Sequence, residues 1–226
     1  MNNESSTSFG FVRLDACMAD DLSVANAARV SFAKYSTSLG GEDIALIEFL
    51  MRERHGTPFE HNSFRFHVKC PLFVAREWFR HRIGSFNEFS ARYSPVENHF
   101  YVPEMDDVRT QIGKPGYYSF EPVDEDLARE VTETIAELNQ RSYGTYTYLV
   151  SRGVAKELAR SVLPVSMYTQ FYWTVNARSL MNFLSLRTAK TAQKEIRDYA
   201  NEVEKVFKEK MPFTHESWVN NGKVCP

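Results

Sequence analysis

Residues 79–94 bring together side chains that can bind an anion and a flat heterocyclic ring. The stretch reads Phe-Arg-His-Arg-Ile-Gly-Ser-Phe-Asn-Glu-Phe-Ser-Ala-Arg-Tyr-Ser. An arginine guanidinium is a planar fork of donors that matches phosphate oxygens, and its face stacks on an aromatic ring. Short serine and asparagine side chains donate and accept hydrogen bonds at the edge of such a ring. The chemistry indicated is recognition of an anionic, aromatic ligand, which means a nucleotide.

Each residue of this stretch also has a plainer explanation. Arginines at a helix end interact favourably with the helix dipole, and asparagine and serine side chains commonly stabilise turns. For any single residue the plainer explanation is the commoner one. For the cluster as a whole, the number of hydrogen-bonding groups gathered around Gly84 favours a binding site.

A helix is expected to position the first part of this cluster. Pro71 suits the first position of a helix, where its missing N–H costs nothing. Apolar residues then recur at helical spacing as far as Ile83, and Gly84 is expected to end the helix. Arg80 and Arg82 would leave from its last turn, and a loop of short polar residues would follow.

Just before that helix, the sequence predicts a polar turn and a strand. The turn is His55-Gly-Thr-Pro-Phe-Glu-His61, for which the residues alone leave a structural and a functional role evenly balanced. Residues 62–70 alternate between apolar and polar types, which predicts a half-exposed strand. Its apolar members are Phe64, Phe66, Val68 and Cys70.

The other elements follow from periodicity and from start and stop signals. Strands are expected at 9–17 and 167–175, and helices at 22–31, 42–54, 124–151, 155–162, 176–187 and 192–210. Residues 95–118 show no clear period and predict an irregular excursion with a short strand at 100–102. Because long loops are often functional, a mobile lid is one hypothesis for this segment.

Three helices carry more specific expectations. In 124–151 the apolar face is expected to be Leu127, Val131, Ile135 and Leu138, and in 192–210 it is Ile196, Tyr199, Ala200, Val203 and Phe207. In 176–187, Asn176 is the expected N-cap. Arg178 would then lie in the first turn, where a cation opposes the helix dipole, so a partner elsewhere in the chain is expected for it.

Length and composition are typical of one folded domain spanning residues 1–226. The chain is 43% hydrophobic and 14% aromatic, with a formal net charge of −2. A near-neutral chain lacks the basic field that a nucleic-acid binder normally carries. Cys17, Cys70 and Cys225 lie far apart without metal-ligand spacing, which favours reduced thiols and no metal site.

The first residues are polar, and residues 1–8 are expected to form a disordered tail. They lack the basic and then apolar pattern of a signal peptide. No apolar run approaches the roughly 20 residues that a membrane crossing requires. The expected location is the cytoplasm, with no membrane partner.

The central stretch has the spacing Arg-His-Arg-x-x-Ser-x-Asn-x-x-Ser-x-Arg. This spacing resembles the signature of the flavin-dependent thymidylate synthases, and so many polar positions in so short a span make a specific motif. The matching residues are Arg80, His81, Arg82, Ser85, Asn87, Ser90 and Arg92. The turn at 55–61 and the segments 160–164, 173–178, 182–187 and 192–197 are also similar to this family, so the resemblance covers most of the chain.

The resemblance implies an α+β subunit with a curved antiparallel sheet flanked by helices. It implies a homotetramer with active sites between subunits. The reaction implied is reductive methylation of dUMP to dTMP. Methylenetetrahydrofolate would donate the carbon and leave as tetrahydrofolate, and FAD reduced by NADPH would supply the hydride.

The resemblance also assigns roles residue by residue. Arg187 is the expected catalytic residue, at the uracil edge, where a fixed positive charge stabilises negative charge on the ring. The expected dUMP contacts are Glu77, Arg80, Glu88, Phe89, Ser90, Ala91, Arg92, Arg160 and Arg187. The expected FAD contacts are Thr57, Arg80, His81, Arg82, Glu88, Asn176, Arg178 and Asn182, with His55 facing either flavin or folate.

Two positions depart from the family's usual pattern. Ala189 stands where an acid is frequent, so the surroundings of Arg187 can differ. Glu77 stands where glutamine is frequent, and its charge is expected to be offset by Arg76 or Arg80. The cysteines are expected to lie outside the polar clusters, with Cys70 in the core, so no thiolate nucleophile is expected.

Two other classes of protein remain open on the residues. One is a flavin- or nucleotide-binding oxidoreductase of other specificity, in which the same arginines hold a different phosphate. The other is an RNA-binding module that uses arginines and aromatic rings for stacking, against which the near-neutral charge counts.

Overall fold

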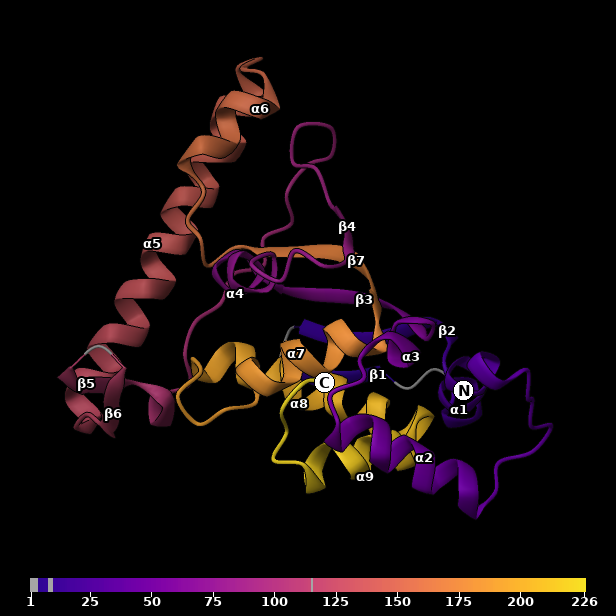
Figure 1. Ribbon diagram of the computed structural model, residues 1–226. Coiled ribbons are helices and arrows are strands. Elements are labelled where there is room, and N and C mark those ends of the chain that lie inside the picture. Colours follow the sequence, from indigo (N-terminus) through magenta and orange to yellow (C-terminus); the bar gives the residue numbers. More distant parts are fainter. Residues whose placement is uncertain (1–3, 8–9, 115) are drawn as a thin grey trace. The chain divides into compact units, whose positions relative to one another are not determined.

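The computed structural model (Figure 1) describes residues 4–7, 10–114 and 116–226. The chain divides into two compact units that alternate along the sequence. The first unit consists of Met1–Val68, Glu77–Asn87 and Phe171–Pro226. The second consists of Lys69–Arg76 and Glu88–Gln170. The expectation of a single domain over residues 1–226 stays a prediction.

Most of a five-stranded sheet belongs to the first unit. Its strands are β1 (Glu4–Thr7), β2 (Gly10–Met18), β3 (Ser63–Pro71), β7 (Tyr168–Asn176) and β4 (Ser85–Glu88), in the order β1-β2-β3-β7-β4. β1 and β2 pair antiparallel, with Glu4 opposite Arg13. The predicted α+β class with an antiparallel sheet is confirmed. Residues 4–7 form a strand where the sequence predicts a disordered tail, and 1–3 and 8 lie outside the described residues.

The predicted alternation in β3 is confirmed, because Phe64, Phe66, Val68 and Cys70 are all fully buried. Phe66 stacks on Trp173 of β7, with 5.7 Å between the ring centroids. Trp173 in turn lies against Phe183, whose centroid is 5.0 Å away. An aromatic core therefore joins the sheet to the helix that follows β7.

The described part of the first unit also contains the α-helices α1 (Asp21–Arg29), α2 (Gly41–Arg52), α3 (Thr57–Glu60), α7 (Ala177–Arg187), α8 (Lys194–Lys210) and α9 (Pro212–Asn220). α8 packs against β1, β2, α7 and α9, and its whole predicted apolar stripe is buried. The turn predicted at 55–61 contains the short helix α3.

The sequence predicts no helix after residue 210, so α9 was missed. Pro212 in fact begins α9, and the carboxylate of Asp21 accepts hydrogen bonds from the backbone N–H groups of Phe213 and Thr214, at 3.1 and 2.8 Å. The cap therefore comes from a residue at the other end of the chain, which no local signal reveals.

The helix predicted over 71–83 is shorter than expected, because α4 spans only Leu72–Trp78. Trp78 is fully buried and stacks on Phe183 at 4.8 Å, and the chain then turns, with the N–H of His81 donating to the carbonyl of Trp78. Gly84 is not a helix C-cap. A side chain there would place its Cβ 2.9 Å from Trp173 Nε1 and 3.0 Å from the carbonyl of Thr174, so glycine allows a close approach to β7.

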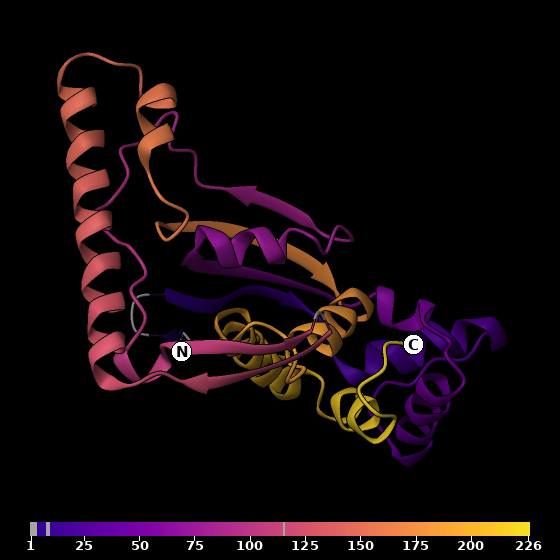
Figure 2. The ribbon, with the colours of Figure 1, turned by 90° about the vertical axis from the view of Figure 1, so that its left-hand side faces the viewer.

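The second unit contains α5 (Glu125–Ser151), α6 (Lys156–Ala159) and the hairpin of β5 (Arg109–Lys114) and β6 (Tyr117–Pro122). Figure 2 shows α5 as one long helix with the hairpin joined to its first turn. The prediction that residues 95–118 are irregular is wrong from residue 109 onward, where the chain forms this hairpin. Its strands pair antiparallel, with Arg109 opposite Pro122. Its side chains are mostly exposed, so the alternation that predicts a half-buried strand is missing.

The predicted apolar face of α5 is also wrong in part. Leu127 and Leu138 are 40% and 56% exposed, whereas Ala128, Asn139 and Tyr146 are buried. The polar groups of the buried residues of α5 form hydrogen bonds: Asn139 Nδ2 donates to the carbonyl of Tyr101, and the Tyr146 hydroxyl accepts from the N–H of Val96. Hydrogen bonding therefore lets polar residues occupy the buried side.

Within the ranges that the structure describes, none of the helices combines the length and apolarity that crossing a membrane requires. The same ranges hold no cluster of three or more histidine, cysteine or acidic side chains that could bind a metal ion.

Candidate functional site

A cavity of about 680 Å³ lies in the first unit. α3, the segment after α4, α7 and the C-terminal residues supply its walls. The lining residues are Glu60, Arg80, His81, Arg82, Ile83, Asn176, Arg178, Ser179, Asn182, Leu186, Arg187 and Cys225. Since α4 ends at Trp78, the chain over 80–83 is irregular and reaches the cavity wall, where the arginines of the central motif meet those of α7.

Arg187, the last residue of α7, is held by three hydrogen bonds. Its Nη1 donates to Glu77 Oε2 at 2.7 Å, its Nη2 donates to the carbonyl of Glu77 at 3.1 Å, and its Nε donates to His81 Nε2 at 3.0 Å. These contacts fix the plane of the guanidinium at the cavity wall. A positive charge in a fixed orientation stabilises negative charge on a ligand without reorganisation.

The contact between Arg187 and His81 defines the state of the imidazole. Because Arg187 Nε donates, His81 Nε2 must accept, so the proton of the neutral ring lies on Nδ1. Burial, and then the charge of Arg187, lower the pKa of His81 from 6.5 to about 4. The imidazole is therefore neutral at physiological pH, and Arg187 carries the positive charge of the pair.

Glu77 is the counter-ion of Arg187, which corrects the expectation that Arg76 or Arg80 offsets its charge. Burial raises the pKa of Glu77, and Arg187 opposes that shift. Both side chains are mostly shielded, with 28% of Glu77 and 20% of Arg187 exposed. The ion pair is therefore less screened by water than a surface pair.

The partner expected for Arg178 is Glu60 of α3. Arg178 Nη1 donates to Glu60 Oε1 at 2.6 Å, and the Glu60 hydrogen bond raises the pKa of Arg178. Gly56 makes room for this arginine, because a Cβ there would lie 2.4 Å from Arg178 Nε. Glu60 and Gly56 both belong to the predicted turn, but no sequence signal connects either with Arg178.

Most of the flavin residues expected from the resemblance meet at this cavity. Asn176 lines it and also caps α7, accepting from the N–H of Ser179 at 2.8 Å as predicted. Thr57 and His55 are exposed and are not among the lining residues. His55 instead packs edge-on against Phe49, with the ring centroids 5.7 Å apart.

Cys225 corrects the expectation that every cysteine lies away from the polar clusters. It lines the cavity, and its Sγ lies 3.2 Å from the carbonyl of Arg178. Burial raises the pKa of Cys225, so the thiol stays protonated and is no activated nucleophile. Cys70 is buried in β3 as predicted.

The other expected dUMP residues belong to the second unit. The N–H of Phe89 donates to the carbonyl of Gln170 at 2.8 Å, and Glu88 Oε1 accepts from the Thr169 hydroxyl at 2.7 Å. Ala91 is buried in the cluster that includes Val96 and Tyr146. These contacts fix the backbone at 88–91.

The two arginines expected for dUMP in the second unit are both exposed. Arg92 lies over the Tyr93 ring, 5.0 Å from its centroid, and Arg160 begins the 3₁₀ turn Arg160–Val162. Glu77, Arg80 and Arg187 belong to the first unit and Glu88–Arg92 and Arg160 to the second, so the expected dUMP set is divided between the units.

Comparison with known proteins shows the family to which the chain belongs. The family model described as thymidylate synthase complementing protein matches residues 13–213. The chain is 50% identical over 210 residues to the flavin-dependent thymidylate synthase of Thermosipho africanus, covering 93% of this chain and 91% of that protein. The corresponding protein of Thermotoga neapolitana is 48% identical over 213 residues, with coverage of 93% and 91%.

A solved structure is also similar throughout. It is the UMP/dUMP methylase PolB of Streptomyces cacaoi bound with 5-Br UMP, with a TM-score of 0.90 and 43% identity, covering 97% of this chain and 98% of that one. The fold, the arginine-lined cavity and these matches define an enzyme of the methyltransferase class. The chain belongs to the family of flavin-dependent thymidylate synthases, which confirms the resemblance indicated by its central motif.

Proposed function

We propose that this protein converts dUMP to dTMP by reductive methylation, with FAD as its bound cofactor. Methylenetetrahydrofolate would donate the carbon and leave as tetrahydrofolate, and NADPH would reduce the flavin. The observation that carries the proposal is the Arg187 guanidinium, held by Glu77 and His81 at the wall of a cavity of about 680 Å³. The cytoplasmic location and the homotetramer with intersubunit sites stay predictions.

The cavity suits an anionic dinucleotide. Its walls carry the guanidinium groups of Arg80, Arg82 and Arg178, which match phosphate oxygens, and the amides of Asn176 and Asn182, which can reach ring edges. Gly56 keeps the backbone beside Arg178 free of a side chain. These residues would hold the FAD, and the chemistry that it supplies when bound is hydride transfer.

Arg187 would do the electrostatic work on the substrate. Methylation at C5 of uracil requires that carbon to be nucleophilic, so negative charge develops on the ring. A guanidinium with a fixed orientation at the ring edge favours ionisation at N3 and stabilises that charge. Because His81 is neutral and Glu77 is bound on the other donors, Arg187 keeps its charge and its orientation throughout.

The second unit would supply the remaining nucleotide contacts. The backbone N–H groups of Ser90 and Ala91, the Ser90 hydroxyl and the exposed guanidinium groups of Arg92 and Arg160 are suited to phosphate and sugar oxygens. Glu88, held by Thr169, would bind both the substrate and the flavin.

A visible absorption spectrum tests this function directly. The purified protein should show a flavin spectrum, or acquire one with added FAD, and the spectrum should shift when dUMP is added. With NADPH and methylenetetrahydrofolate it should then form dTMP and tetrahydrofolate. A protein that stays colourless with FAD, or one that produces dihydrofolate in place of tetrahydrofolate, would contradict the proposal.

A second candidate is methylation of UMP, which the similarity to a UMP/dUMP methylase favours. The two activities differ only in tolerance of the ribose 2′-hydroxyl. Comparing kcat/KM for UMP and dUMP separates them: a ratio near one would indicate a methylase of both nucleotides, and a strong preference for dUMP a thymidylate synthase.

A further inference from the structure

The residues that follow α9, Asn221–Pro226, run back along α7 to the cavity, and we call them the C-terminal strap. Its second and third residues, Gly222 and Lys223, are in left-handed conformation, at φ 75 and φ 56, and the N–H of Lys223 donates to the carbonyl of Trp218 at 2.8 Å. A left-handed conformation is unfavourable for a residue other than glycine. Other contacts of Lys223 must therefore stabilise it there.

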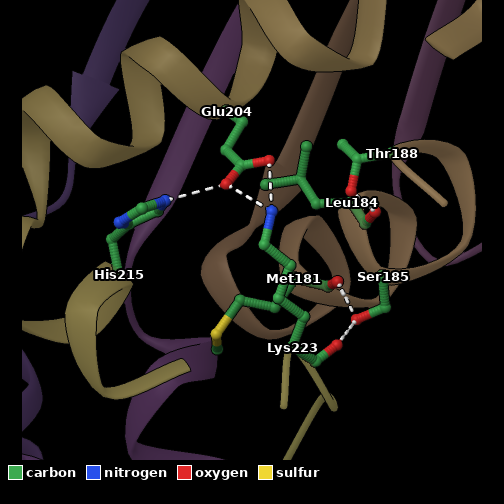
Figure 3. Close-up of polar contacts among 7 residues, drawn as sticks. All are labelled: Met181, Leu184, Ser185, Thr188, Glu204, His215 and Lys223. Carbon is green, nitrogen blue, oxygen red and sulfur yellow. Dashed lines mark hydrogen bonds and ion pairs between the residues drawn. The ribbon is translucent and has the colours of Figure 1, made fainter. Parts of the chain in front are cut away.

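An ion pair holds the side chain of Lys223. Its Nζ lies 2.8 and 2.9 Å from the two carboxylate oxygens of Glu204 on α8, and 5.0 Å from the centroid of the Trp218 ring. Figure 3 shows Glu204 between Lys223 and His215, whose Nε2 is 3.0 Å from Glu204 Oε1. Burial raises the pKa of Glu204, but the hydrogen bonds from His215 and Lys223 outweigh it and the pKa is lowered. The anchor is therefore an ionised, mostly buried carboxylate.

The backbone of Lys223 is tied to α7. The Ser185 hydroxyl lies within hydrogen-bond distance of the carbonyls of both Lys223 and Met181 (Figure 3). Ser185 lies on the same helix as Asn182 and Arg187, which line the cavity. The strap is thus fixed to two helices, α8 through its side chain and α7 through its backbone.

The far end of the strap contacts Arg178. Arg178 Nε donates to the carbonyl of Pro226 at 2.8 Å, and Cys225 Sγ lies 3.2 Å from the carbonyl of Arg178. Arg54 Nη1 donates to the carbonyl of Cys225 at 3.0 Å, which fixes this end from the segment that follows α2. Arg178 is therefore held on Nε by the strap and on Nη1 by Glu60.

We propose that the strap is a positioning element for the cofactor site, with Lys223 as the residue that anchors it and Arg178 as the residue that it orients. This inference rests on the proposed function, in which Arg178 contacts the anionic flavin dinucleotide. The hydrogen bond from Arg178 Nε to the Pro226 oxygen fixes the direction in which the guanidinium presents its remaining donors to the ligand. Because the Arg178 side chain is already ordered in the free protein, less side-chain conformational entropy is lost when the ligand binds.

The test compares FAD affinity in Lys223→Met with that of the wild type and of Lys205→Met. Lys205 is a matched control, because its Nζ also lies 2.7 Å from an acid of α8, Glu202, but its side chain is 71% exposed. Titration of each FAD-free protein, followed by flavin fluorescence, should give about tenfold weaker binding in Lys223→Met. Lys205→Met should bind like the wild type, and Lys223→Arg should restore most of the affinity.

Two further measurements separate positioning from general destabilisation. The first is the midpoint temperature of thermal unfolding of each FAD-free protein. FAD binding is then measured well below all of these midpoints, where every variant is folded, so that weaker binding cannot be due to unfolding. Ser185→Ala frees the strap backbone and leaves Lys223 paired, so it should also weaken FAD binding even if Lys223→Met does not fold. Its control is Ser151→Ala, which removes a similar hydroxyl contact from α5.

The outcomes are distinct. If the wild type binds FAD and both Lys223→Met and Ser185→Ala bind it equally well, the strap has no positioning role and this inference is overturned, while the proposed function stands. If the wild type binds no FAD at all, the proposed function fails and this inference fails with it. Weaker FAD binding in both variants, with the two controls unchanged, supports the strap.

Discussion

Arg187 Nε donates a hydrogen bond to His81 Nε2 across 3.0 Å, although 106 residues separate them. The contact requires a neutral imidazole, and the lowered pKa of His81, about 4, agrees with it. Glu77 holds the other side of the same guanidinium at 2.7 Å. One cation, one carboxylate and one neutral ring thus form a unit whose charge and orientation are fixed before any ligand binds.

Arg187→Ala should abolish most dTMP formation and leave FAD binding intact. Loss of one charge-stabilising donor from an active site lowers kcat by roughly 100- to 1,000-fold. Steady-state kinetics together with the flavin spectrum measure both effects. Arg197→Ala is a suitable control, since that arginine of α8 bonds the carbonyl of Lys190 and lies outside the cavity lining. Near wild-type turnover by Arg187→Ala would remove Arg187 from its catalytic role.

His81 should make the folded state less stable as the pH falls. Its pKa is about 4 when folded, below the ordinary 6.5, so the unfolded chain takes up the proton first. The free energy of unfolding should therefore be unaffected by this residue above about pH 6.5 and fall between about pH 6.5 and 4. Urea unfolding at a series of pH values measures the slope.

The matched variants for that slope are His81→Gln and His61→Gln. Glutamine at 81 keeps an acceptor for Arg187 but does not titrate, so the part of the slope due to His81 should disappear. His61 is exposed and serves as the control. An identical pH dependence for His81→Gln and the wild type would show that the imidazole is not held neutral.

Gly56→Ala should weaken FAD binding, because the new Cβ would lie 2.4 Å from Arg178 Nε and displace its guanidinium. Gly144→Ala on α5 is the control: its Cβ would meet nothing within 4 Å, and the exchange should stabilise the helix by up to about 1 kcal/mol. Flavin fluorescence titration and thermal unfolding measure the two variants. Unchanged FAD affinity in Gly56→Ala would mean that Arg178 is not held for the cofactor.

Cys225→Ser should retain dTMP formation. Burial raises the pKa of the Cys225 thiol, so no thiolate is present to attack the substrate, and serine preserves a donor toward the carbonyl of Arg178. Turnover of the variant, compared with Cys17→Ser at an exposed position, is the measurement. A loss of activity confined to Cys225→Ser would point to a covalent role for this cysteine.

Arg92→Ala should chiefly weaken dUMP binding. The guanidinium is exposed and stacked beside Tyr93, and loss of a hydrogen bond to a charged group costs roughly 1.5–3 kcal/mol. The KM for dUMP should rise with a smaller change in kcat, whereas Arg109→Ala, in the β5 strand, should leave both unchanged. An unaltered dUMP affinity would remove Arg92 from the nucleotide site.

The sequence alone predicted those elements whose signals come from residues close together in the chain. The alternation of β3, the buried stripe of α8 and the Asn176 cap of α7 depend on residues within a turn or two, and all three are confirmed. The central motif also predicted the family, because its polar residues are close neighbours in sequence. The α5 face and the 109–122 hairpin were missed where exposed apolar residues carry no periodic signal.

Only the tertiary structure decided which groups meet. Arg187 rather than Arg76 or Arg80 balances the charge of Glu77. Glu60 and Pro226 hold Arg178, and Cys225 lines the cavity wall. Gly84 is needed for contact with Trp173, not for a helix cap. These partners lie up to 118 residues apart. Their pairing is set by how the buried aromatic core and the helices pack, and no local pattern in the chain encodes it.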